Sequence, residues 1–342
     1  MPVTYEKILG CLLGAAAGDA MGAATETRNM DQIREYFHGY VGTFLTPPDD
    51  TFAHGCDLGQ VTDDFSIAYV NCCEMVANGG KASQEAAERA LVKWFSVPQF
   101  GRFAGPTTKA AVEALMGKAQ EPSGTPAFVP AVQNNKGTNG AAMKAAPLAL
   151  FSGGDLDRAI ADTVTMCKVS HNNNVALSGA CAVAAAAAAA LKDSCRLEDL
   201  IEAGVYGAIH GDEAGRREGN AICGPSIAKR IRKAAELGLM AEDMEHAIRT
   251  IGAYMGSGLM AAEAVPAVFG IIAASKGSVV SGIWGGVNIG DDTDTVATMV
   301  GGILGAYEGV NAFPDDYLPT IREHNDIDIE KLAKDIWALE KR

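Results

Sequence analysis

Apolar side chains recur at three- or four-residue spacing along most of the chain, which is the spacing of one face of an α-helix. Between residues 82 and 95, for example, Ala86, Ala90, Leu91 and Trp94 would share one side of a helix. No segment shows the sustained alternation of apolar and polar residues that predicts a half-buried strand. The pattern predicts helices over residues 5–24, 64–77, 82–95, 107–115, 155–168, 175–191, 197–206, 227–237, 241–251, 263–274, 295–307 and 329–339. The expected fold class is therefore all-α.

Two segments lack this periodicity. Residues 38–60 are rich in Gly, Pro and Asp and predict a long loop, and a loop of this length in a domain commonly has a function or acts as a lid. Residues 121–138 contain three prolines and lead into Asn139-Gly140, a dipeptide suited to a tight turn. No repeat, low-complexity linker or change of composition divides the chain. We therefore expect residues 1–342 to form one domain, a compact orthogonal helical bundle.

The composition narrows the classes of partner. A formal net charge of -14 and a pI near 4.9 argue against a broad phosphate-binding surface, so long nucleic acid is not an expected partner. A small anionic ligand is still compatible with this charge. The eight cysteines lack metal-finger spacing, which predicts reduced thiols. The alanine-rich run 182–190 is too short and too weakly apolar for a membrane span, and the first residues lack a signal-peptide pattern, so we expect a cytoplasmic protein.

The densest candidate chemistry lies in Asp291-Asp292-Thr293-Asp294-Thr295, between Gly290 and an apolar run. Asp292 and Asp294 are two residues apart and can converge on one hard cation, while Thr295 can both ligate it and cap the following helix. An all-oxygen set suits Mg²⁺, Mn²⁺ or Ca²⁺ better than Zn²⁺ or copper. The alternative is an Asp-rich first helical turn that is only solvated and favours the helix dipole.

Two further segments favour the metal interpretation. Thr62-Asp63-Asp64 also follows a glycine-containing turn and precedes an apolar helical run, so the chain repeats the same arrangement. Residues 10–22 form a small-residue helix that contains Asp19 and leads to Glu26. The glycines of this helix are four residues apart and allow very close helix packing, which could bring Glu26 beside the two acidic turns.

Other catalytic signatures are missing from the sequence. It contains no Gly-x-Ser-x-Gly nucleophile elbow, no His-Glu-x-x-His zinc motif, no phosphate-binding loop and no dinucleotide-binding glycine motif. His171 lies in a polar step between two predicted helices, where a single histidine is more often an exposed loop or capping residue than a functional one.

The ordered set of these motifs resembles the ADP-ribosylglycohydrolase family, which includes the ADP-ribosyl-acceptor hydrolases and the dinitrogenase reductase-activating glycohydrolase. The family's opening glycine-rich helix matches Gly10 to Glu26, and its first metal turn matches residues 62–64. Its substrate loop matches residues 138–147, its histidine step matches Ser170-His171, and its second metal turn matches residues 288–295. The matches span nearly the whole chain.

The resemblance implies a helical fold with a central cleft that holds two Mg²⁺ or Mn²⁺ ions. Carried over by motif, one ion would be held by Thr62, Asp63, Asp64 and Asp294. The other would be surrounded by Asp292, Asp294 and Thr295, with Glu26 as an additional candidate. Asp294 would bridge the two ions.

The resemblance also implies hydrolysis of the bond between C1 of a ribose and an acceptor atom, with a metal-activated water attacking. Carboxylates near C1 would stabilise the developing positive charge, and Glu26, Asp63 or Asp64 could take the proton from the water, with Asp294 completing the expected catalytic set. The nucleotide part of the substrate would lie against Gly105, Thr138, Asn139, Gly140 and His171.

Three positions depart from the family pattern. Phe65-Ser66-Ile67 replaces the usual continuation of the first turn, Asp291 replaces a glycine and is expected to face water, and Lys144 replaces an arginine, which loses bidentate phosphate recognition. Three functions stay open: hydrolysis of an ADP-ribosyl group, hydrolysis of a smaller ribosyl or nucleoside-like compound, and non-catalytic binding of ADP-ribose. The acceptor, the preferred cation and the oligomeric state, monomer or small homo-oligomer, also stay open.

Overall fold

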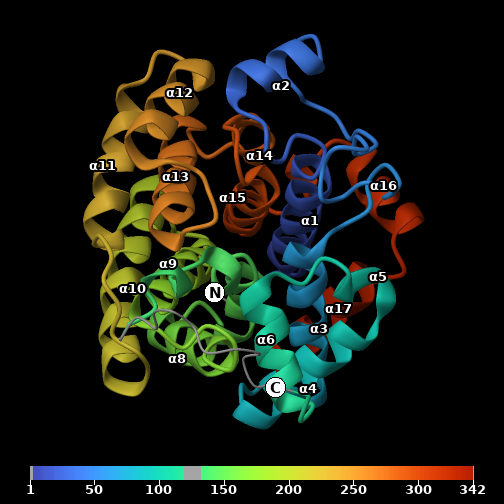
Figure 1. Cartoon of the computed structure of the whole chain (residues 1–342), viewed down its shortest axis with the longest axis vertical. Coiled ribbons are helices and arrows are strands. Elements are labelled where there is room, and N and C mark those ends of the chain that lie inside the picture. Colours follow the sequence, from blue (N-terminus) through green and yellow to red (C-terminus); the bar gives the residue numbers. More distant parts are fainter. Residues whose placement is uncertain (1–2, 119–131, 342) are drawn as a thin grey trace, which may run out of the picture.

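The computed structural model describes residues 3–118 and 132–341 (Figure 1). Within these residues the chain forms helices and has only two isolated β-bridges, which confirms the all-α prediction. The α-helices are α1 (Tyr5–Gly22), α2 (Met30–Tyr36), α3 (Asp63–Ala77), α4 (Gln84–Ser96), α5 (Pro98–Gly101), α6 (Pro106–Leu115), α7 (Ala145–Leu148), α8 (Leu156–Cys167), α9 (Asn174–Ala190), α10 (Leu197–Glu218), α11 (Ile227–Met240), α12 (Met244–Met255), α13 (Ala261–Ala274), α14 (Val279–Asn288), α15 (Thr293–Glu308), α16 (Tyr317–His324) and α17 (Ile329–Glu340). Single 3₁₀ turns occur at Asn134–Lys136, Asn139–Ala141, Ala149–Ser152 and Val310–Ala312.

Many of these helices begin at a side-chain cap. A short polar residue accepts a hydrogen bond from a backbone N–H group of the first turn, which satisfies a donor that has no partner inside the helix. Residues that cap in this way are Thr4, Asn29, Ser83, Asp155, Asn173, Ser226, Asp243, Ser278 and Asp328. The helix starts therefore follow from local sequence.

Helices α1 and α15 pack against each other near the centre of the molecule (Figure 1). Their glycines face one another, and the backbones approach closely: a Cβ atom at Gly14 would lie 2.1 Å from the carbonyl oxygen of Gly301, and one at Gly10 would lie 2.3 Å from that of Gly305. No side chain other than hydrogen fits at such a distance. The close packing predicted from the four-residue glycine spacing is confirmed, and it joins segments nearly three hundred residues apart in the chain.

A second close contact joins α9 to α10. A Cβ atom at Gly207 would lie 2.1 Å from the carbonyl oxygen of Cys181, and one at Gly211 would lie 2.4 Å from that of Leu177. The alanine-rich α9 is buried along its whole length, so its small side chains do have close neighbours, as predicted. The predicted helix over 197–206 was too short, because these glycines pack against α9 and α10 continues to Glu218.

Other boundaries also differ from the sequence predictions. Helices α2, α5, α7, α14 and α16 were not predicted, since α14 contains three glycines and the others are short. The expectation that Thr295 caps the last central helix is wrong: α15 begins at Thr293 and its N-cap is Asp292. Residues 38–60 contain no helix, as predicted, whereas most of the loop predicted over 121–138 lies outside the described residues. None of the described helices combines the length and the hydrophobicity that a bilayer crossing requires.

Candidate active site

Backbone hydrogen bonds hold the second acidic turn, residues 291–295, in place. Asp291 adopts a positive φ of 63°, its N–H donates to Arg28 O (2.9 Å), and its carbonyl accepts from Thr27 N (2.8 Å). Asp292 N donates to Ser257 O at 3.2 Å. The Asp291 side chain is exposed, as expected, while the side chains of Asp292 and Asp294 are buried. The turn therefore directs two of its three carboxylates into the protein.

Glu26 joins these two carboxylates. Because α1 ends against the start of α15, a Cβ atom at Gly22 would lie only 2.4 Å from the Cα atom of Asp294. Carboxylate oxygens of Glu26, Asp292 and Asp294 lie within 4.8 Å of one another. Asp292 also accepts a hydrogen bond from the Asn139 side-chain amide, and Asp294 Oδ1 accepts one from Thr295 N at 2.9 Å. The structure thus brings together residues from three distant segments.

Asp19 positions the first acidic turn, residues 62–64, and the sequence analysis missed this role. The Asp19 carboxylate accepts hydrogen bonds from Thr62 N (3.0 Å), Thr62 Oγ1 (2.7 Å) and Phe65 N (2.8 Å), and so caps α3 from the neighbouring helix α1. A carboxylate inside an otherwise apolar helix needs such donors, because burying an unpaired charge is costly. That requirement was the available signal for Asp19.

Together the two turns crowd carboxylates at the base of one cavity. Burial, followed by repulsion from Asp294 and Asp292, raises the pKa of Glu26 to about 10. Burial and repulsion from Asp19 raise the pKa of Asp63 to about 8 and that of Asp294 to about 7. Burial, followed by repulsion from Asp294, holds the pKa of Asp64 and of Asp292 well above the usual range. Such a cluster is unfavourable when ionised unless cations compensate it.

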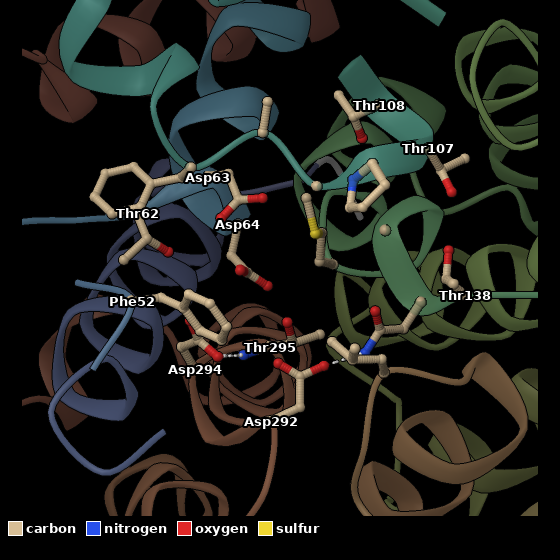
Figure 2. A pocket seen from close by; sticks show the side chains of 18 of the residues that line it. Phe52, Thr62, Asp63, Asp64, Thr107, Thr108, Thr138, Asp292, Asp294 and Thr295 are labelled. Atoms are coloured by element: carbon tan, nitrogen blue, oxygen red, sulfur yellow. Dashed lines mark hydrogen bonds between the residues drawn. The ribbon is translucent and has the colours of Figure 1, made fainter. Parts of the chain in front are cut away.

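The donor set fits hard divalent cations. All of the candidate ligands are carboxylate or hydroxyl oxygens, the type that Mg²⁺ and Mn²⁺ prefer. Asp64 Oδ1 is buried and has no hydrogen-bond partner among the described residues, so a polar atom that normally must be satisfied is left for another ligand. Figure 2 shows Asp63 and Asp64 across the cavity from Asp292 and Asp294.

The cavity has a volume of about 440 Å³ and includes all of the predicted substrate-binding residues in its lining: Gly105, Thr138, Asn139, Gly140 and His171. Thr62 and Thr295 line it as well. Met143, from the segment matched to the substrate loop, lines it too. Leu259, Phe52, Phe103 and Arg102 also line it and were not predicted, because a single apolar or basic residue in a loop carries no signal for a site. Lys144 is buried and is not part of this lining, so the phosphate contact expected from its position is not supported.

His171 is buried, so its interpretation as an exposed loop residue is wrong. Its Nδ1 atom lies 2.8 Å from Ser170 Oγ, and a Cβ atom at Gly140 would lie 2.8 Å from its Nε2 atom. Burial, followed by the positive charges of Lys144 and Lys136, lowers the pKa of His171 to about 3. The ring is therefore neutral near pH 7 and presents its Nε2 edge to Gly140.

Comparison with known proteins gives a consistent result. The family model described as ADP-ribosylglycohydrolase matches residues 1–342. The Escherichia coli protein YegU is 28% identical, covering 96% of this chain and 95% of that protein. Bovine ADP-ribosylhydrolase ARH3 is 24% identical, covering 95% of this chain and 91% of that protein. A solved structure of an ADP-ribosylglycohydrolase-related protein complex has a TM-score of 0.66 at 21% identity and covers 98% of both chains, which supports the fold. The chain therefore belongs to the ADP-ribosylglycohydrolase family and is a hydrolase that acts on glycosidic bonds.

Proposed function

We propose that the protein hydrolyses the bond between C1 of the ribose in an ADP-ribosyl group and its acceptor atom, with two divalent cations, Mg²⁺ or Mn²⁺. One observation carries the proposal: Glu26, Asp292 and Asp294 converge to within 4.8 Å at the base of a cavity that the Thr62–Asp64 turn also lines. A ribosyl bond develops positive charge at C1 as it breaks, so converging carboxylates suit this reaction.

The residues divide into two overlapping ligand sets. Thr62, Asp63, Asp64 and Asp294 would hold one cation, and Asp292, Asp294, Thr295 and Glu26 would hold the other. The unsatisfied Asp64 Oδ1 supports the first set, and the Glu26–Asp292–Asp294 cluster supports the second. When bound, the cations would neutralise the acids, hold ribose hydroxyls and lower the pKa of a water molecule.

The chain itself supplies orientation and a proton acceptor. Asp19 fixes the start of α3, and the Asn139 amide fixes one oxygen of Asp292, so both acidic turns are set before substrate binds. Glu26, Asp63 and Asp64 are the candidate bases for the attacking water. Gly140 lacks a side chain, and the space that a Cβ atom would take is occupied by the neutral ring of His171, which packs against this turn.

The test is release of ADP-ribose from peptides that carry one ADP-ribosyl group on serine or on arginine, measured by liquid chromatography with mass spectrometry. We expect release with Mg²⁺ or Mn²⁺, and none with excess chelator or in the Asp294→Asn variant. Binding of ADP-ribose without release from either peptide would instead support a binding protein. Release of ribose from a nucleoside-like compound, with neither peptide cleaved, would support the smaller substrate.

A further inference from the structure

One wall of the cavity is aromatic, and it continues into the predicted nucleotide-binding residue Gly105, which follows Phe103 in the same turn. Phe52 comes from the long segment 38–60, and Phe103 and Arg102 come from the turn that precedes α6; we call these three residues the aromatic wall. Figure 2 shows Phe52 on the side of Thr62 and Asp294, whereas Thr107 and Thr138 lie on the opposite side.

Different parts of the fold hold the two sides in place. Phe103 packs on Ala53 and Cys56, which form a small apolar cluster with Ala23 just after α1. Arg102 donates hydrogen bonds to Cys56 Sγ (2.9 Å) and to His54 O (3.3 Å), so it helps to hold the loop 38–60 in place. On the other side, Asn139 N donates to Leu259 O at 2.9 Å. The aromatic wall is therefore tied to α1 and the loop 38–60, and the predicted nucleotide side is tied to the segment before α13.

Phe52 is the exposed aromatic ring of this wall. Its neighbour Ala53 is fully buried and anchors the loop, yet 71% of the Phe52 side chain is accessible although it borders the cavity. A large apolar ring at the mouth of a charged cavity gains free energy when a flat apolar group covers it. The ring is therefore available to a ligand, whereas Phe103 already has the guanidinium of Arg102 above its face, 4.4 Å from the ring centroid.

The charge of Arg102 on the wall disfavours a cationic leaving group. Among the described residues that line the cavity, every carboxylate belongs to Glu26 or to the two acidic turns, and Arg102 is the basic side chain. A cationic guanidinium leaving group would find no carboxylate on the wall, and would meet the positive charge of Arg102. An arginine-linked substrate would thus meet like-charge repulsion from Arg102 on this wall.

We propose that the aromatic wall binds the leaving group, and that the preferred substrate carries a planar, uncharged aromatic group on C1 of its ribose. This inference rests on the proposed function, because it assigns the nucleotide to the Thr138–Gly140 side. In the reaction the bond from C1 to the aromatic group breaks and the water oxygen bonds to C1. The leaving group keeps the bonding electron pair and takes one proton, so that the products are ADP-ribose and the protonated aromatic compound.

The experiment compares kcat/KM on 4-nitrophenyl ADP-riboside, prepared as both anomers, with kcat/KM on a serine-linked ADP-ribosyl peptide. For each variant, kcat/KM on the nitrophenyl substrate is divided by kcat/KM on the peptide, and this ratio is compared with that of wild type. The comparison cancels the greater intrinsic reactivity of the nitrophenyl bond. We expect Phe52→Ala to lower this ratio roughly tenfold, the effect of losing one aromatic stacking contact. Phe52→Tyr keeps the ring and should restore the ratio. The control is Tyr254→Ala, which removes an exposed aromatic ring outside the cavity and should change neither substrate.

Binding of ADP-ribose, which has no leaving group, separates the two sides of the cavity. Calorimetry should give the same affinity for wild type and Phe52→Ala, and a matching loss of affinity would place Phe52 on the nucleotide side and overturn the inference. If Phe52→Ala cleaves both substrates with an unchanged ratio of kcat/KM values, this inference is overturned while the proposed function still stands. If wild type cleaves neither substrate, the proposed function fails and the inference fails with it.

Discussion

Replacing Gly301 by alanine tests whether the contact between α1 and α15 controls both stability and the site. The added Cβ atom would lie 2.0 Å from the carbonyl oxygen of Gly14 and 2.6 Å from its carbonyl carbon. Ordinary contact begins at 3.4 Å, so the two helices must separate by about 1.4 Å along this direction. The neighbour is backbone, and no side-chain rotation can relieve the overlap.

The expected magnitude is a difference between two opposing effects. Alanine is favoured over glycine inside a helix by about 1 kcal/mol. Overpacking a buried contact costs about 1–3 kcal/mol, and a rigid backbone neighbour places this variant at the upper end of that range. Taking about 3 kcal/mol of overpacking minus about 1 kcal/mol of helix propensity gives a net loss of about 2 kcal/mol in the free energy of unfolding.

Urea unfolding followed by far-ultraviolet circular dichroism measures this loss, and Gly252→Ala provides the matched control. Gly252 lies within α12, and the nearest atom to its added Cβ would be Ile289 Cγ1 at 3.8 Å, an ordinary contact. The control should gain up to about 1 kcal/mol from helix propensity alone. Gly301→Ala should also bind Mg²⁺ more weakly, since Asp294 lies on α15 and Glu26 follows α1. Stabilisation of both variants by the same amount would refute the reasoning.

Three further predictions concern the site. The pKa values of Asp63 and Asp294 are raised to about 8 and 7, well above those of unfolded carboxyls, so the cation-free protein should lose stability as the pH rises from about 4 to 8. The difference in Tm between the protein with Mg²⁺ and the protein with excess chelator should therefore increase over the same pH range. Equal melting temperatures at pH 8 would contradict the metal site. Asp294→Asn should lose bound metal and at least about tenfold in kcat/KM, whereas Asp291→Asn, at an exposed carboxylate, should keep both. Metal content per chain and turnover are measured for both variants. If Asp291→Asn loses more metal and activity than Asp294→Asn, the ligand assignment must shift. Gly140→Val should displace the His171 ring, which lies 2.8 Å from the added Cβ position, and should weaken ADP-ribose binding, measured by calorimetry, at least about tenfold. An unchanged affinity in a folded variant would contradict the predicted role of Gly140 in substrate binding.

The sequence predicted the helices that carry a clear apolar periodicity, and failed where tertiary contacts override local preference. Glycines at 207, 211 and 215 disfavour a helix by propensity, yet they let α10 pack on α9, and that packing extends the helix to Glu218. Helix α14 was missed for the same reason, since three glycines lie within its ten residues. Helix α2 was missed although Asn29 and Gln32 form a capping box, because only Ile33 among its residues is buried.

For the site, the acidic turns were recognisable because several carboxylates beside an apolar run need compensation. Their placement in one cavity agrees with the resemblance, while the roles assigned to the individual residues remain predictions. Asp19 was missed because its partners, Thr62 and Phe65, are more than forty residues away in the chain. The aromatic wall was missed because Phe52 belongs to a loop without periodicity, and nothing in the sequence indicates which loop side chains reach a cavity.

The pairing of α1 with α15 bears on how the chain folds during synthesis. The first helix leaves the ribosome with its glycine face uncovered, and the helix that covers it is completed only when Glu308 has been added. Contacts between such distant segments carry a large loop-closure entropy and form late. Glu26 and Asp294 therefore meet only after residue 294 has been synthesised, and truncation before residue 293 leaves the Glu26–Asp292–Asp294 cluster unassembled.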